Sequence, residues 1–258
     1  MRLMKRILSA AAVLALSASL LVGCSSGTAS SVPVSASSAA ESTVSSVEET
    51  ASSAVDENEA AAAQLLNDLT GSYQELWPVI LADEYKQTWL DDCTALVGED
   101  NAEAAFEKLS SMVTGDVYGE DAVKAYANGD GAYFCGFTNS LAILTFDGET
   151  STISGTDKDG NVLFSHTYHY IGMEPVRGLY EFQSDDADSG EFTYFFLAPD
   201  TSAETYHIEF RYGSDTDALS QYDAGDYAYW LASGISTDCD QTMIDNCIEL
   251  FCTENLAG

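Results

Sequence analysis

The chain has 258 residues, of which 42 are Asp or Glu and nine are Lys or Arg, so its formal net charge is −33 at pH 7. A surface this acidic repels the phosphate backbone of DNA and RNA, which excludes nucleic acid as a partner. The length suits one domain of ordinary size together with shorter flanking segments.

The first segment carries three basic residues within its first six positions, followed by an apolar stretch over 7–22. This order predicts a secretory signal peptide rather than a membrane span, because the apolar stretch is short. The run Leu21-Val22-Gly23-Cys24 resembles the lipobox of bacterial lipoproteins. The resemblance implies that the peptide is cut before Cys24 and that the cysteine sulfur is acylated.

We therefore expect residues 1–23 to be a lipoprotein signal peptide and membrane lipid to be a partner through the Cys24 anchor. Two acyl chains anchor a protein stably, since each buried methylene adds about 0.8 kcal/mol. The expected location is the extracytoplasmic face of the cell membrane. The alternative is a plain signal peptide that is cut at another position. Without the leader, six basic residues oppose 42 acidic ones, which makes the charge −36.

Residues 24–58 are predicted to be a disordered tether. After Cys24 this segment is mostly Ser, Ala, Thr and Val, with no aromatic residue and no Lys or Arg. It cannot bury enough apolar surface to offset the entropy of ordering. The folded domain is expected over 59–258.

Within this domain, helical patterns enclose a run of short strand patterns. Helices are predicted over 59–69, 83–96, 101–113, 120–127, 217–232 and 237–252. Strands are predicted over 141–147, 150–154, 161–170, 178–183, 191–197 and 205–212, because these segments are rich in aromatic and β-branched residues. The pairs Asp147-Gly148, Asp159-Gly160 and Ser189-Gly190 indicate hairpin turns. Strands joined in order by tight turns predict a mainly β fold with flanking helices, closed as an up-and-down β-barrel.

Five cysteines follow Cys24, at positions 93, 135, 239, 247 and 252. Export permits disulfides, and the odd number leaves at least one thiol unpaired or intermolecular. No Cys-x-x-Cys pair is present, so a cysteine zinc knuckle is not indicated. We interpret the cysteines mainly as small buried residues, with room for one disulfide.

Several motifs occur in an order that resembles one known family. They are GSYQELWPVIL at 71–81, TYHYIG at 167–172, the long segment 177–210, SDTDALSQ at 214–221 and ISTDCDQTMIDNCIELF at 235–251. Together they are similar to the ZinT family, also called the YodA or lipocalin-like zinc-binding family. The resemblance implies a lipocalin-like, calycin-like barrel.

The family binds zinc through three histidines, placed relative to an Ala-Pro corner that Ala198-Pro199 matches here. Phe195 and Thr205 stand at two of the three ligand positions, and His207 stands at the third. Zinc takes four ligands, usually three or more from protein, so a site at His207 requires further protein ligands. Glu209 shares a strand face with it, and His169 is the preferred third ligand, ahead of His166. The alternative is a polar barrel interior in which His207 is only hydrogen-bonded.

The resemblance implies a membrane-anchored extracytoplasmic binding protein that captures zinc or another divalent metal for a metal-uptake transporter. The alternative is a metal-free lipocalin-like module that binds a small apolar ligand, a peptide or a partner protein. An enzyme is not expected, because the sequence has no nucleophile elbow, phosphate loop or dinucleotide fingerprint.

Overall fold

The computed structural model describes residues 57–199 and 207–257. The predicted signal peptide, Cys24 and nearly all of the predicted tether lie outside these ranges, as does Thr205. Within them, no helix is both long and apolar enough to cross a membrane.

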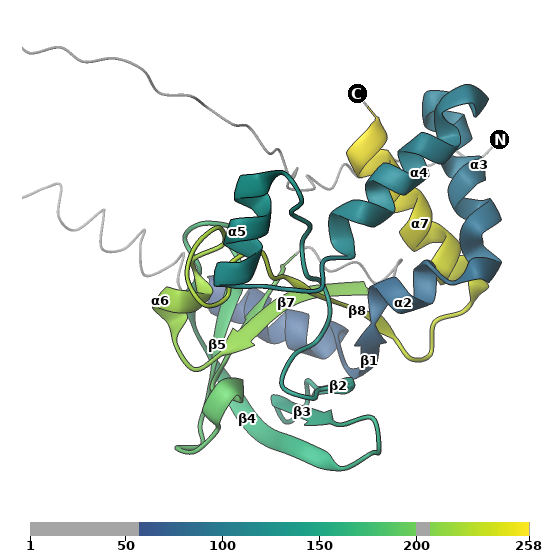
Figure 1. Ribbon diagram of the computed structural model, residues 1–258. Coiled ribbons are helices and arrows are strands. Elements are labelled where there is room, and N and C mark those ends of the chain that lie inside the picture. The colour runs from purple at the N-terminus through teal and green to yellow at the C-terminus, as the bar shows by residue number, and fades with distance from the viewer. Residues whose placement is uncertain (1–56, 200–206, 258) are drawn as a thin grey trace, which may run out of the picture. The chain divides into compact units, whose positions relative to one another are not determined.

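Eight antiparallel strands close into a barrel in which each strand pairs with its neighbour in sequence and β1 pairs with β8 (Figure 1). The strands are β1 (Gly71–Glu75), β2 (Ile143–Asp147), β3 (Thr152–Thr156), β4 (Val162–Met173), β5 (Tyr180–Ser184), β6 (Tyr194–Leu197), β7 (His207–Gly213) and β8 (Ala232–Ser236). The domain is a lipocalin-like barrel, as the sequence predicted.

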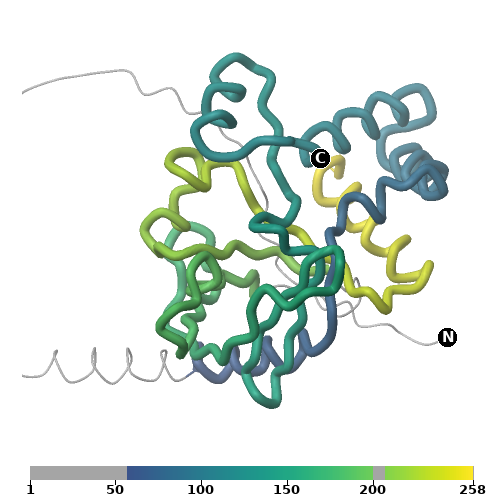
Figure 2. Tube along the Cα trace, turned by 60° about the horizontal axis from the view of Figure 1, so that its bottom comes forward, coloured from purple at the N-terminus to yellow at the C-terminus, as the bar shows by residue number. Residues whose placement is uncertain are grey.

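The helices lie beside the barrel. A helix over 57–68 supplies Ala62, Leu65 and Leu66 to the barrel core. The remaining elements are α2 (Leu76–Ile80), η1 (Asp83–Tyr85), α3 (Lys86–Val97), α4 (Glu99–Val113), α5 (Glu120–Asn128), η2 (Gly190–Phe192), α6 (Thr216–Leu219) and α7 (Gln241–Leu256). Helices α3, α4 and α7 pack together around a second apolar core, and both views place them to one side of the barrel (Figures 1 and 2).

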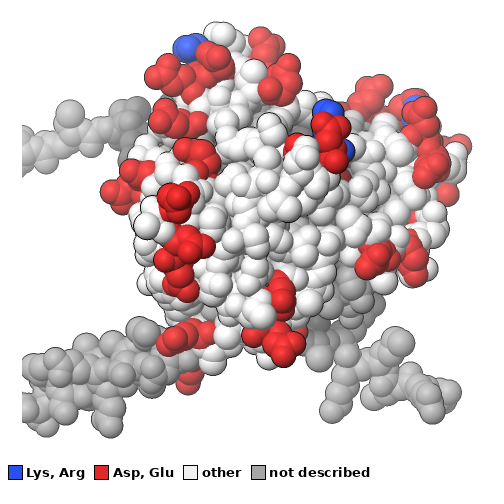
Figure 3. Space-filling view, turned by 90° about the horizontal axis from the view of Figure 1, so that it is seen from below, with Lys and Arg blue, Asp and Glu red and all other residues white. Residues whose placement is uncertain are grey.

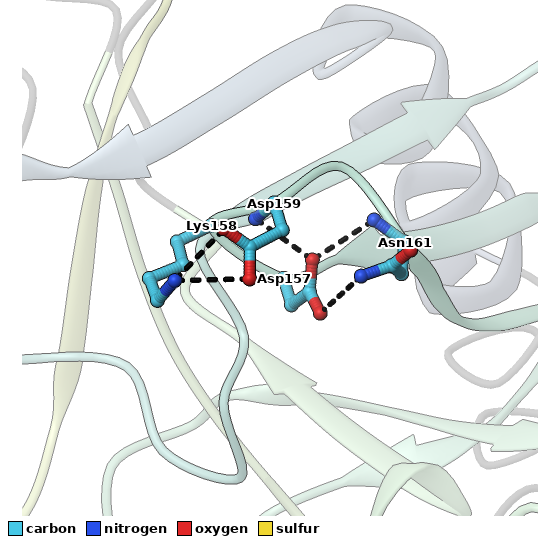
Figure 4. Close-up of polar contacts among 4 residues, drawn as sticks. All are labelled: Asp157, Lys158, Asp159 and Asn161. Atoms are coloured by element: carbon cyan, nitrogen blue, oxygen red, sulfur yellow. Dashed lines mark hydrogen bonds and ion pairs between the residues drawn. The ribbon is translucent and has the colours of Figure 1, made fainter.

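The β3–β4 hairpin shows how local chemistry fixes a turn, and it confirms the predicted turn at Asp159-Gly160 (Figure 4). The Asp157 carboxylate accepts hydrogen bonds from the backbone N–H groups of Asp159 and Asn161, both at 2.9 Å. It also accepts one from the Asn161 side-chain amide at 2.9 Å, and these bonds hold the pKa of Asp157 below its usual value. Gly160 adopts φ 82°, which the turn requires and glycine accepts.

Two parts of the sequence prediction are wrong. The predicted helix over 217–232 is a single turn, α6, followed by an irregular segment and then β8. The positive φ values of Gly225 and Tyr229, 75° and 57°, are incompatible with a continuous helix. Strands β1 and β8 were not predicted, although they close the barrel.

Candidate ligand cavity and the predicted metal site

The predicted metal ligands on β7 face away from the barrel interior. Ile208, Phe210 and Tyr212 are buried in the barrel core. Because side chains alternate along a strand, His207 and Glu209 lie on the opposite face. There His207 is opposite Ile235 of β8, and Ile235 belongs to the core beneath the helices.

The third predicted ligand, His169, is on β4, and β5 and β6 lie between β4 and β7. Its Nδ1 lies 2.6 Å from the carboxylate of Asp185, and its side chain is 52% exposed. Tyr168 and Tyr170 face the barrel core, so His169 also points outward. Side chains that point outward from β4 and from β7 are too far apart to bind the same ion, because two other strands lie between them. The structure therefore does not bring His169 together with His207 and Glu209.

The two β4 histidines, His166 and His169, lie on opposite faces of the strand. His166 has the same parity as Phe164 and Tyr168, and its ring lies 5.9 Å from the Phe164 ring. It is therefore the inward histidine, with 17% of its side chain exposed. Its Nδ1 lies 2.7 Å from the carboxylate of Asp186.

Phe195, at the first ligand position implied by the resemblance, closes the barrel interior with aromatic rings. Its ring centroid lies 5.4 Å from those of Tyr168 and Tyr212 and 6.3 Å from that of Phe210. Phe195, Phe210 and Tyr212 are fully buried. Tyr212 uses its hydroxyl group on the backbone of Thr138, accepting from N–H at 2.6 Å and donating to the carbonyl at 2.9 Å.

The side chains at the predicted ligand positions do not fit zinc. The described residues contain no group of three or more His, Cys, Asp or Glu side chains arranged to hold a metal ion. At Phe195, the first of the three positions that the resemblance implies, the barrel interior offers carbon atoms and the Tyr212 phenol, which already has partners. Zinc prefers imidazole, thiolate and carboxylate ligands.

A cavity of about 320 Å³ lies outside the barrel, where β1 passes into α2. Its lining comes from three segments: Glu75, Trp77, Pro78 and Leu81; then Val113, Thr114 and Gly115; and then Phe134, Cys135 and Gly136. The size is at the lower end for small-molecule sites, and the lining is mostly apolar, as such sites usually are.

Local sequence explains how this cavity is held open. Pro78 sits in the first turn of α2, where its missing N–H has no helical partner in any case. A bridge between Thr114 and Phe134 holds the other two lining segments together. Gly115 packs against the backbone of residues 132–133, where a Cβ atom would come within 2.5 Å of the Ala132 carbonyl oxygen.

The polar side chains of Glu75 and Cys135 line the cavity. The Glu75 carboxylate accepts a hydrogen bond of 2.6 Å from the Phe137 N–H through Oε1, which fixes its orientation. Burial raises the pKa of the Cys135 thiol to about 12, so this thiol is neutral at physiological pH. Glu75 is therefore the one carboxylate in a largely apolar lining, and it suits a ligand that donates hydrogen bonds or carries positive charge. Nothing in the sequence around Glu75 distinguishes this carboxylate, because two distant segments, 113–115 and 134–136, complete the site around it.

A second polar cluster ties the far loops to the barrel. Tyr222 has the Arg177 guanidinium 4.2 Å from its ring centroid and the Arg211 guanidinium 4.4 Å from it. Arg211 is fully buried and donates to the carbonyl groups of Leu219 and Tyr227. Arg211 donates its hydrogen bonds to backbone carbonyl groups of the 214–230 segment, so we interpret the cluster as structural.

The surface electrostatics follow the composition. On the face shown in Figure 3, acidic side chains far outnumber basic ones. The described lysines lie on the surface, and three of them contact acidic neighbours: Lys86 with Glu103, Lys124 with Asp121 and Lys158 with Asp159. A field of this sign attracts cationic ligands and repels anionic ones.

Comparison with known proteins gives a likeness in structure only. No family model and no curated protein match the chain. Among solved structures, the Zn(II)-bound ZinT-like domain of Streptococcus pneumoniae AdcA matches with a TM-score of 0.45 and 14% identity, over 71% of this chain and 89% of that one. The domain is similar to a ZinT-like domain. Zn(II)-bound AdcA from the same organism matches with a TM-score of 0.42 and 16% identity, over 72% of this chain and 35% of that one.

The chain spans about a third of the length of AdcA, and both solved structures hold zinc.

Proposed function

We propose that this protein is a membrane-anchored, extracytoplasmic binding protein whose lipocalin-like domain holds a small organic ligand, and no metal, in the cavity beside Glu75 and Trp77. The observation that carries the proposal is the cavity itself, with its apolar lining and one oriented carboxylate. The aromatic packing around Phe195 supports this proposal, because the packed rings fill the place where a barrel of this kind would hold a ligand or an ion.

The chemistry of the lining defines the ligand class. Trp77, Phe134 and Leu81 offer apolar surface, and Glu75 offers a negative charge at its edge. An aromatic or aliphatic amine matches both, since its ammonium group pairs with the carboxylate while its hydrocarbon part contacts the rings. The acidic surface would favour the approach of such a cation.

Titration of the mature chain carrying Cys24→Ala, without a histidine tag, tests this proposal. Phenethylamine is the probe, and tryptophan fluorescence is the readout because Trp77 lines the cavity. We expect saturable quenching that weakens by about 10-fold or more in Glu75→Gln, which loses the charge-assisted bond. Glu149→Gln, at the exposed β2–β3 turn, is the matched control and should bind like the parent.

Calorimetric titration of the same protein with zinc decides between this proposal and metal capture. We expect no saturable heat. Saturable zinc binding at one site, or phenethylamine binding that is equal in the parent and Glu75→Gln, would overturn the proposal.

A further inference from the structure

Two fully buried cysteines face each other in the helical core. Cys93 of α3 and Cys252 of α7 are 0% exposed, and their Sγ atoms lie 3.9 Å apart. Each lies one turn beyond another fully buried residue of its helix, Trp89 on α3 and Ile248 on α7. The two thiols therefore point from packed faces of two helices that are in direct contact.

We propose that Cys93 and Cys252 form a disulfide that links α3 to α7 when the chain folds outside the cytoplasm. A disulfide requires an S–S separation of about 2.0 Å, so the sulfurs must approach by roughly 1.9 Å. Rotation about the two Cα–Cβ bonds moves the sulfur atoms by distances of this order.

The bond must form before the helical core is fully packed. In the folded domain neither sulfur is accessible to an external reagent, since both residues are 0% exposed. Burial also raises the pKa of both thiols, which suppresses the thiolate that attacks a disulfide. Oxidation therefore belongs to the folding chain, and packing then protects the product from reduction.

The oxidant is a disulfide, either of a small thiol or of an exported oxidoreductase. The Cys93 thiolate attacks one sulfur of this donor, which forms a mixed disulfide and expels one donor thiolate. The Cys252 thiolate then attacks Cys93 Sγ and expels the second donor thiolate. Two electrons pass to the donor disulfide, which takes up the two protons that the cysteines lose.

The other cysteines do not offer an equivalent contact. Cys135 lines the cavity near β1 and α2, Cys239 lies before α7, and Cys247 lies on α7 itself. Among the cysteines in the described part of the chain, the pair whose sulfur atoms are in contact is Cys93 and Cys252. Pairing these two leaves Cys135, Cys239 and Cys247 as thiols.

Oxidative refolding of the mature chain with Cys24→Ala tests the proposal independently of any ligand. The reduced, unfolded chain is refolded in a buffer of reduced and oxidised glutathione, denatured again without reductant, and treated with a maleimide. We expect three modified cysteines rather than the five that the reduced chain offers. Proteolysis and mass spectrometry should identify one peptide pair, joined through Cys93 and Cys252.

Thermal unfolding gives a second readout. The bond closes a loop across 159 positions of sequence, so its reduction should lower the midpoint of the parent by about 10 °C. Cys93→Ala and Cys252→Ala should lose this sensitivity to reductant, whereas Cys135→Ala, also at a buried site, should keep it. Five modified cysteines after refolding, or a bond between any other pair, would overturn the proposal, and neither result depends on how well the variants fold.

Discussion

Replacement of Glu174 by Gln tests how the β4–β5 connection is held. Glu174 is 0% exposed, and its two carboxylate oxygens accept hydrogen bonds of 2.7 Å from the N–H groups of Val176 and Arg177. The Tyr222 hydroxyl donates a third bond at 3.3 Å. Glutamine has nearly the same shape but only one oxygen, so in either orientation its NH₂ group faces a backbone N–H. The lost bond to a charged acceptor and the buried donor left without a partner should together cost about 3 kcal/mol.

Urea unfolding followed by tryptophan fluorescence measures this cost. With an unchanged slope m, the loss should lower the urea midpoint by on the order of 1 M. The matched control is Glu181→Gln on β5, where burial, with the nearby charge of Glu174 as a second cause, already raises the carboxyl pKa. This control should change stability by less than about 0.5 kcal/mol. Equal midpoints for Glu174→Gln and the parent would refute the role assigned to these bonds, and hydrogen exchange of the Val176 and Arg177 amides would show whether the connection loosens locally.

Three further predictions concern the barrel, the thiols and the anchor. Phe195→Ala removes a fully buried ring and should lower the free energy of unfolding by about 3–5 kcal/mol, measured by urea unfolding; a loss below 1 kcal/mol would contradict the packing described here. Burial raises the pKa of the Cys135 and Cys247 thiols to about 12 from 9.0, so the folded state holds these protons after the unfolded chain has released them. Stability should therefore be intact below pH 9 and fall by up to about 1.4 kcal/mol per pH unit for each thiol between pH 9 and pH 12, and Cys135→Ala should make the decline shallower in urea midpoints taken along that range. Cys24→Ala should abolish incorporation of labelled fatty acid and move the protein out of the detergent phase, and equal labelling of both forms would exclude lipidation at that cysteine.

The barrel was predictable from sequence because its central strands carry strong local signals. Segment 161–170 alternates aromatic residues with polar ones, and the turns between strands contain glycine at the required places. Strands β1 and β8, with the sequences GSYQE and ASGIS, carry no such signal. They are strands because each completes the hydrogen bonds of the other, which is a property of the closed ring rather than of either segment.

The position of the site was less predictable, for two physical reasons. Alternation along β4 and β7 gave the two faces correctly, but the polar face of β7 was placed inside the barrel, whereas Ile208, Phe210 and Tyr212 face inward. The same comparison of apolar parity would have identified His166, rather than His169, as the inward histidine. The cavity beside Glu75 is also lined by segments about 40 and 60 positions further along the chain. No pattern within any one of these segments predicts the cavity.

Closure of the barrel between β1 and β8 has a consequence for the timing of folding. Tyr73 pairs with Ser236, so the ring is incomplete until most of the domain has been synthesised. Contacts between such distant residues form slowly, because the intervening chain must be ordered first. Such a delay benefits any polypeptide that crosses a membrane in an extended state, since the barrel cannot fold before its last strand is available. We expect a refolding rate limited by this last pairing, and we expect a chain truncated before β8 to remain unfolded.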